Sequence, residues 1–166
     1  RYFMTKHYRT SKETGFQTSE IIEEVESKET IEILVDNTKT FQKIIGFGGA
    51  FTESSAYTLS KMDPLKRQEV LEAYFDKNKG LNYNIGRVHI HSCDFSLENF
   101  TYVEDFDKDL KTFSIKRDFK WVIPMIKDAE KIAGHKIELL ASPWSPPAWM
   151  KSNNDMNHGG VLLPEY

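Results

Sequence analysis

The feature that most constrains the fold is an alternation of strand-like and helix-like segments between residues 44 and 142. Three apolar, strand-like runs ("IIGFGGAF", "YNIGRVHIHSCDFS" and "KIELLAS") are separated by segments with helical spacing at 54–61, 64–80 and 117–134. Strands that are joined through helices pair in parallel, with right-handed crossovers. The sequence therefore predicts an α/β fold built on a parallel sheet.

The helical segments carry signals for where they begin and end. Asp63 precedes Pro64, which predicts an N-cap followed by a proline in the first turn, and Gly80 is expected to end this helix. The segment 117–134 has apolar residues at helical spacing and ends on a glycine that suits the C′ position. Pro124 lies inside it and is expected to kink the helix or to mark its early turns.

The residues before this alternation predict extended structure. Residues 1–28 are polar and are interpreted as an extended lead-in, Thr30–Asp36 alternates apolar and polar residues as a half-exposed strand does, and Asn37–Thr40 resembles a turn. The sequence begins with neither an initiator methionine nor an apolar signal core, so we expect residues upstream to have been removed.

Composition excludes several classes of function. A formal net charge of −3 over 166 residues argues against nucleic acid as a partner. The single cysteine, Cys93, forms neither an internal disulfide nor a metal site on its own. No apolar run approaches the roughly 20 residues that span a bilayer, so no transmembrane segment is predicted.

Polar and aromatic residues follow each of the three predicted strands, in the segments "GAFTE", "HSCDFS" and "SPWSPPAW". The carboxyl ends of parallel strands lie at one edge, which is where ligands bind in open α/β sheets and in β/α barrels. We therefore expect Glu53, Asp94 and Trp144 to converge on that edge.

The charged residues near this edge each allow more than one interpretation. A carboxylate at a strand end, such as Asp94 or Glu53, binds sugar hydroxyls or a metal, acts as acid or base, or merely caps a loop or forms a salt bridge. Arg87 forms either a buried structural ion pair or a fork for substrate. His89 and His91 are expected to point to one sheet face, as in a zinc site. No clustered third ligand is visible, so packed or substrate-facing histidines are favoured.

The glycine-rich segment at Gly46, Gly48 and Gly49 is not a nucleotide-binding motif. It lacks the third glycine of the dinucleotide fingerprint and the lysine of a phosphate loop. We interpret it as a tight strand end at which one backbone approaches another.

Trp144 and Trp149 lie in a proline-rich loop after the third strand. The prolines fix φ and make the loop rigid, and rigid aromatic faces at a ligand edge pack against the C–H groups of sugar rings. Next to Asp94 and Arg87, the indoles indicate a carbohydrate ligand. If one tryptophan belongs to the core instead, we expect it to be Trp149.

The same residues carry a family likeness. The segments "FQKIIGFGGAFTESSA", "YNIGRVHIHSCDFS" and "LLASPWSPPAWMKSN", followed by "MNHGG", resemble glycoside hydrolase family 30, the family of glucosylceramidase and of bacterial β-1,6-glucanases. The likeness runs in order from about Thr30 to Tyr166. It implies the N-terminal part of a (β/α)8 TIM barrel, whose first three β/α units occupy 41–166, preceded at 1–40 by strands of a β-rich side domain.

The resemblance also implies a function. Family members are retaining β-glycosidases, and this chain would act on β-glucosides without a metal or other cofactor. Matched residue by residue, Asp94 binds the sugar hydroxyls, Trp144 lines the same subsite and Arg87 supports the catalytic carboxylates. The predicted substrate-binding residues are Asp94, Trp144, Arg87, Glu53 and Trp149.

The two glutamates that carry out the reaction in this family are not found here. The acid/base belongs to an Asn-Glu-Pro motif that is absent from the sequence, and Glu165 follows a proline without the strand context. A retaining site needs two carboxyl groups about 5 Å apart, and such a barrel takes about 250 residues. We therefore expect an N-terminal fragment that is inactive alone, with the rest of the barrel as its partner.

Two other functions stay open. One is a carbohydrate-binding α/β module without chemistry, and the other is a small nucleotide or metal protein based on the glycines and histidines. The substrate is expected to be a carbohydrate or a glycolipid, with ceramide, a β-1,6-glucan chain and other aglycones all open. Secretion or periplasmic export, and a part in sphingolipid metabolism, follow only from the resemblance.

Overall fold

The computed structural model describes residues 7–15, 18–21 and 34–166. The chain divides into two compact units, Arg1–Gln42 and Lys43–Tyr166. In the first, β1 (His7–Thr10) pairs antiparallel with β2 (Thr18–Ile21). The lead-in is therefore extended in its described part, and its assignment to a side domain stays a prediction.

The predicted strand Thr30–Asp36 lies mostly outside the described residues, and its described part, Leu34–Asp36, is not a strand. The turn after it is confirmed. Thr38 donates its backbone N–H to the Asp36 carboxylate at 3.0 Å, and Lys39 donates to the Asp36 carbonyl at 3.2 Å.

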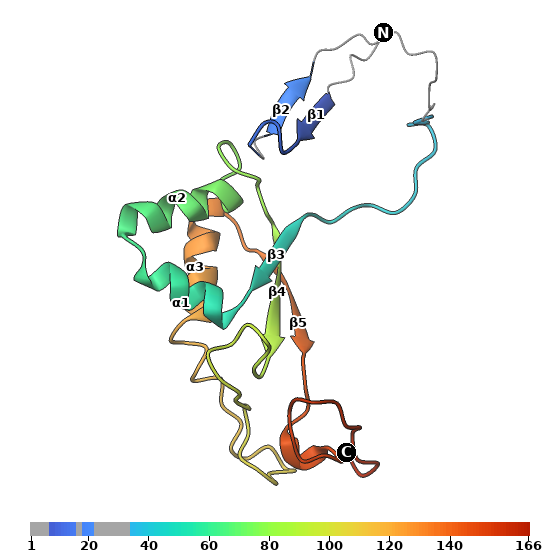
Figure 1. Cartoon of the computed structure of the whole chain (residues 1–166), viewed down its shortest axis with the longest axis vertical. Helices are drawn as coiled ribbons and strands as arrows, with labels where there is room; N and C mark the ends of the chain where they lie inside the picture. The colour runs from blue at the N-terminus through green and yellow to red at the C-terminus, as the bar shows by residue number, and fades with distance from the viewer. Residues whose placement is uncertain (1–6, 16–17, 22–33) are drawn as a thin grey trace. The chain divides into compact units, whose positions relative to one another are not determined.

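In the second unit, β3 (Gly48–Phe51), β4 (Ile85–Ile90) and β5 (Glu138–Pro143) form a sheet in the order β3–β4–β5 (Figure 1). Both pairings are parallel, which confirms the prediction from the alternating segments. Of the glycines in and before the first strand, Gly48 acts as predicted, because a Cβ on it would lie 1.6 Å from the carbonyl oxygen of Ile85. A Cβ on Gly46 would instead meet the side chain of Asn84, and one on Gly49 would have, of the described residues, only Tyr83 within 4.0 Å.

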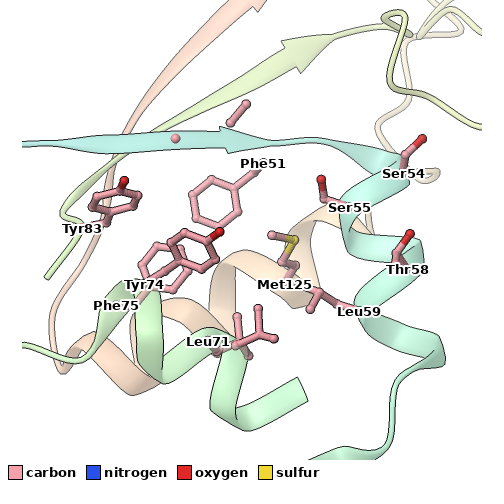
Figure 2. Close-up of a pocket in the computed structure, with 13 residues that line it drawn as sticks. Phe51, Ser54, Ser55, Thr58, Leu59, Leu71, Tyr74, Phe75, Tyr83 and Met125 are labelled. Atoms are coloured by element: carbon pink, nitrogen blue, oxygen red, sulfur yellow. The ribbon is translucent and has the colours of Figure 1, made fainter. Parts of the chain in front are cut away.

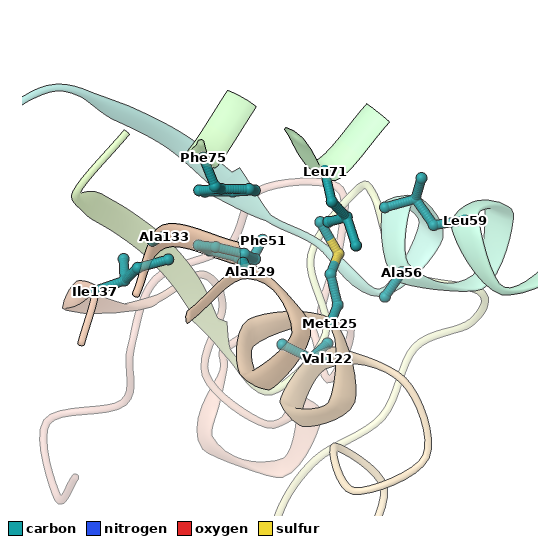
Figure 3. Close-up of a cluster of buried hydrophobic side chains, with 10 residues drawn as sticks. All are labelled: Phe51, Ala56, Leu59, Leu71, Phe75, Val122, Met125, Ala129, Ala133 and Ile137. Carbon is teal, nitrogen blue, oxygen red and sulfur yellow. The ribbon is translucent and has the colours of Figure 1, made fainter. Parts of the chain in front are cut away.

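Helices α1 (Glu53–Lys61), α2 (Pro64–Phe75) and α3 (Val122–Ala133) lie on the same side of this sheet (Figure 1). Among the described residues, no helix has the length and apolar character needed to cross a membrane. The core lies between the helices and the sheet (Figure 3) and consists of Phe51, Ala56, Leu59, Leu71, Phe75, Val122, Met125, Ala129, Ala133 and Ile137.

The predicted N-cap of α2 is confirmed, and its predicted end is not. The Asp63 carboxylate accepts a hydrogen bond from the backbone N–H of Leu65 at 2.9 Å. The helix ends at Phe75 instead of Gly80, because the Asp76 carboxylate accepts the N–H groups of the next turn and reverses the chain. Gly80 then packs where a Cβ would lie 2.1 Å from a helix carbonyl oxygen.

Helix α3 begins at Val122, so the predicted start at Arg117 is wrong, and residues 117–121 form turns. Pro124 is the third residue of the helix and so marks its first turn, one of the two predicted outcomes; a backbone N–H there has no partner within the helix, so the proline removes no intrahelical hydrogen bond. Gly134 has φ +75° and occupies the predicted left-handed C-terminal position.

Candidate functional site

A cavity of about 470 Å³ lies at the carboxyl ends of β4 and β5. Asp94, from the loop after β4, and Trp144, from the segment after β5, line it together. Asn99, Ser145 and His158 contribute further polar groups, and Asp94 is the only carboxylate among the described residues that line it. The parallel sheet thus brings these two predicted residues into one cavity.

Trp144 is held with one face against a cation. Its side chain is 46% exposed, and the guanidinium carbon of Arg87 lies 4.6 Å from the ring centroid. The Arg87 Nε group donates to the hydroxyl of Ser142 at 3.0 Å. Arg87 forms no ion pair with any residue that the structure describes, so its observed contacts fix the indole beside the cavity.

Sequence reasoning did not predict that residues 151–160 also line the cavity. Lys151 is buried, and its ammonium group donates to the carbonyl of Met156 at 3.1 Å. The Ser145 hydroxyl donates to the same carbonyl at 2.6 Å. Gly159 and Gly160, at φ +75° and +79°, complete the turn. The paired glycines were visible in the sequence, but the burial of a lysine was not.

Glu53 lies at the start of α1 and does not line this cavity. Its carboxylate is 2% exposed and faces Arg117, whose Nε donates to Oε1 at 2.7 Å and whose Nη2 donates to Oε2 at 3.3 Å. The backbone N–H of Leu97 also donates to Oε2, at 2.9 Å. Of the interpretations that the sequence allowed, the structure therefore places Glu53 in a salt bridge.

Burial on its own would raise the pKa of Glu53. Hydrogen bonds from Arg117 and from the backbone of Leu97, together with the Arg117 charge, outweigh that effect and hold the pKa below its ordinary value. The Glu53 side chain is therefore an anion at neutral pH and is suited to orient its neighbours, whereas proton transfer calls for a pKa near the working pH.

The two histidines do not share a sheet face, because β4 ends at Ile90 and His91 has φ +60°. The Nε2 atom of His89 accepts the backbone N–H of Glu53 at 3.2 Å, so its proton is on Nδ1, which donates to the His91 carbonyl. The His91 Nδ1 accepts from the N–H of Tyr102 at 2.9 Å, and burial lowers the pKa of His91. Both imidazole rings are thus bound to backbone groups of the protein.

The described residues contain no group of three or more His, Cys, Asp or Glu side chains placed to hold a metal ion. The zinc interpretation of the two histidines therefore gains no support from this part of the chain. The sequence likewise showed no clustered third ligand.

Trp149 is buried, in the 3₁₀ turn Ala148–Met150, as expected for the tryptophan assigned to the core. Its ring lies edge-on to Tyr166, at 5.0 Å between centroids, and 5.5 Å from Phe106. It does not line the cavity of Asp94 and Trp144.

A second cavity, of about 560 Å³, lies between β3 and the helices (Figure 2). Apolar side chains such as Phe51, Leu71 and Met125 line it, with hydroxyl groups from α1 at one side. None of the described residues around it is Asp, Glu, His, Lys or Arg. It therefore offers no acid, base or cation for chemistry.

Known proteins support both the family and the fold. The sequence model of the glycosyl hydrolase family 30 TIM-barrel domain matches residues 44–165. "Putative glucosylceramidase 3" of Caenorhabditis elegans is 44% identical over 135 residues, which cover 80% of this chain and 26% of that protein. "Lysosomal acid glucosylceramidase" of Mus musculus is 42% identical over 126 residues, which cover 75% of this chain and 24% of that protein. The chain thus spans about a quarter of the length of these curated relatives.

A solved structure agrees with these matches. SrfJ from Salmonella typhimurium has a TM-score of 0.71 and 37% sequence identity, over 90% of this chain and 34% of that one. The predicted family resemblance and the predicted fold class, an α/β part of a TIM barrel, are confirmed. The roles of the five predicted substrate-binding residues stay predictions.

Proposed function

Because this chain belongs to glycosyl hydrolase family 30, we propose that it is part of a retaining β-glycoside hydrolase that acts on β-glucosides. The cavity at Asp94 and Trp144 binds the glucose ring in this proposal. The observation that carries it is the meeting of a carboxylate and a half-exposed indole in one cavity at the carboxyl edge of the sheet.

The chemistry of the cavity fits a pyranose. A carboxylate accepts hydrogen bonds from two neighbouring sugar hydroxyls, and the indole packs against the C–H face of the ring. Arg87 stacks on Trp144 and is held by Ser142, so the aromatic surface is fixed before the sugar arrives. Such preorganisation lowers the cost of binding.

Retaining hydrolysis needs a nucleophile and a proton donor about 5 Å apart, and the described cavity residues supply one carboxylate, Asp94. We therefore assign Asp94 to sugar binding and assign the catalytic pair to carboxylates that reach the bound sugar from residues other than those described around the cavity. Neither Glu53 nor Trp149 lines it either, so we give them no direct sugar contact.

The names of the relatives guide the choice of substrate. Both curated relatives described above are named glucosylceramidases, which favours a glucoside with a lipid aglycone over a polysaccharide. In this proposal, the described α/β part packs against the remaining β/α units of the barrel. The mouse relative is named for the lysosome, which supports export from the cytoplasm for this protein as well.

The test is hydrolysis of 4-nitrophenyl β-D-glucoside by the protein at its natural full length. We expect turnover with the β-anomer and none with the α-anomer, and we expect Asp94→Asn to lower kcat/KM by about 100-fold or more. Asp109→Asn is the matched control, because Asp109 is 70% exposed and, among the described residues, forms an ion pair with Lys111 alone.

Two results would count against this function. If Asp94→Asn hydrolyses the glucoside as fast as Asp109→Asn does, Asp94 does not bind the sugar. If the protein binds glucosides in calorimetry without hydrolysing any, the alternative of a carbohydrate-binding module replaces the hydrolase.

A further inference from the structure

The Asp94 carboxylate depends on its loop for its position. It accepts no hydrogen bond from any residue that the structure describes, so the backbone around it sets where it points. The loop is closed at its base, where Ser92 N–H donates to the Phe100 carbonyl at 3.2 Å and Phe100 N–H donates to the Ser92 hydroxyl at 3.1 Å. We call Ser92–Phe100 the Asp94 loop.

The Asp94 loop is fastened at its middle to the first turn of α1. Ser54 donates its N–H to the carbonyl of Phe95 at 2.9 Å. The Glu53 carboxylate accepts the N–H of Leu97 at 2.9 Å. Asp94 therefore lies between a closed base and two fastening points that both belong to α1.

Arg117 binds both the carboxylate that holds the loop and the loop itself, and it does so from outside the cavity. Two of its nitrogens bind Glu53, and Nη1 donates to the Glu98 carboxylate at 2.7 Å. Its guanidinium carbon also lies 4.2 Å from the ring centroid of Phe100. One planar group thus contacts the carboxylate that holds the loop and two residues of the loop itself.

We propose that Arg117 is a positioning residue for sugar binding, which acts by fixing the Asp94 loop through Glu53, Glu98 and Phe100. This inference rests on the proposed function. Arg117 does not line the cavity, so its effect on the sugar passes through the loop.

The planar guanidinium group of Arg117 makes contacts that no other side chain could make together. Glu53 is 2% exposed, and a buried carboxylate needs several directed donors to stay ionised. Arginine supplies them in a fixed plane, and the same plane stacks on Phe100. Lysine would keep the charge but lose the stacking and the simultaneous contacts to both glutamates.

The experiment is a double-mutant cycle on the full-length protein, with kcat/KM for 4-nitrophenyl β-D-glucoside as the readout. We expect Arg117→Met to lower kcat/KM by about 100-fold, as loops displaced by about 1 Å do. In the Asp94→Asn background, the same change is expected to alter kcat/KM by about twofold or less. Loss of fold stability alone would reduce both backgrounds equally.

The matched control is Arg67→Met. Arg67 also forms an ion pair, with Asp128, and is 34% exposed against 29% for Arg117, but it joins α2 to α3. We expect its kcat/KM to match that of the unmodified protein. If Arg117→Met does not fold, Arg117→Lys takes its place in the cycle, with an intermediate loss expected and the same non-additivity with Asp94→Asn.

The outcomes separate this inference from the proposed function. Equal losses from the Arg117 change in both backgrounds, or no loss beyond that of Arg67→Met, would overturn the positioning role while leaving Asp94 as a sugar ligand. Full activity of Asp94→Asn would overturn the proposed function itself.

Discussion

Replacing Glu53 with glutamine tests how the Asp94 loop is held. The carboxylate accepts two hydrogen bonds from Arg117 and one from Leu97. An amide has only one oxygen, so at least one of these donors would face an NH2 group and lose its partner. Breaking a buried ion pair costs about 3–5 kcal/mol. Arg117 is 29% exposed and keeps Glu98, so we expect the lower end, about 3 kcal/mol.

This cost should appear as local opening of the loop, which hydrogen exchange measures directly. A loss of about 3 kcal/mol corresponds to roughly 100-fold faster exchange in peptides that cover 92–100. Glu130→Gln is the control, because Glu130 is 16% exposed and binds Lys136 at 2.7 Å at the far end of α3. Unchanged exchange at 92–100, or an equal rise in the control, would refute the reasoning.

The pH dependence of the same loop has a definite sign. The pKa of Glu53 in the folded protein lies below its ordinary value of 4.5. Above pH 4.5 the carboxylate is ionised in both states and the stabilisation is fully present. It is lost as the pH falls through the folded pKa, so protection of residues 92–100 should decrease only below pH 4.5 and approach that of Glu53→Gln.

Three further predictions follow from individual contacts. Gly86→Ala would place a Cβ 2.3 Å from a ring carbon of Phe51, and overpacking of this kind should lower the free energy of unfolding by about 1–3 kcal/mol in thermal denaturation. Trp144→Ala should raise KM for the aryl glucoside by about 10-fold through loss of stacking, and an unchanged KM would place the sugar elsewhere. Because burial lowers the pKa of His91 below 6.5, stability should fall as the pH drops below 6.5. His91→Asn keeps a hydrogen-bond acceptor for the Tyr102 N–H. We expect it to reduce the difference in the free energy of unfolding between about pH 7.5 and pH 5, as measured by denaturation at both pH values.

Local sequence signals were enough for much of the fold. An aspartate before a proline and a glycine after an apolar helix act through contacts within a few residues, so Asp63 and Gly134 were identified correctly. The parallel sheet followed from the order of segments. The meeting of Asp94 and Trp144 in one cavity followed in turn from the sheet.

Contacts between segments that are distant in the chain could not be predicted from the sequence. Phe119 fits the helical spacing of 117–134 and is 59% exposed, because α3 has not yet begun there. Before the helix starts, Arg117 is bound to Glu53 and Asp118 accepts the hydroxyl of Tyr102. These partners lie far away in the sequence, so no periodicity predicts them. For the same reason the sequence left open whether Glu53 binds substrate or forms a salt bridge, since its arginine partner lies 64 residues away.

The most direct test of the sugar site is a crystal structure of the full-length protein with a β-glucoside-derived inhibitor. We expect the pyranose ring to lie against the exposed face of Trp144, with two hydroxyls about 3 Å from the Asp94 carboxylate. A sugar bound elsewhere on the molecule, with the cavity of Asp94 and Trp144 left to solvent, would contradict it.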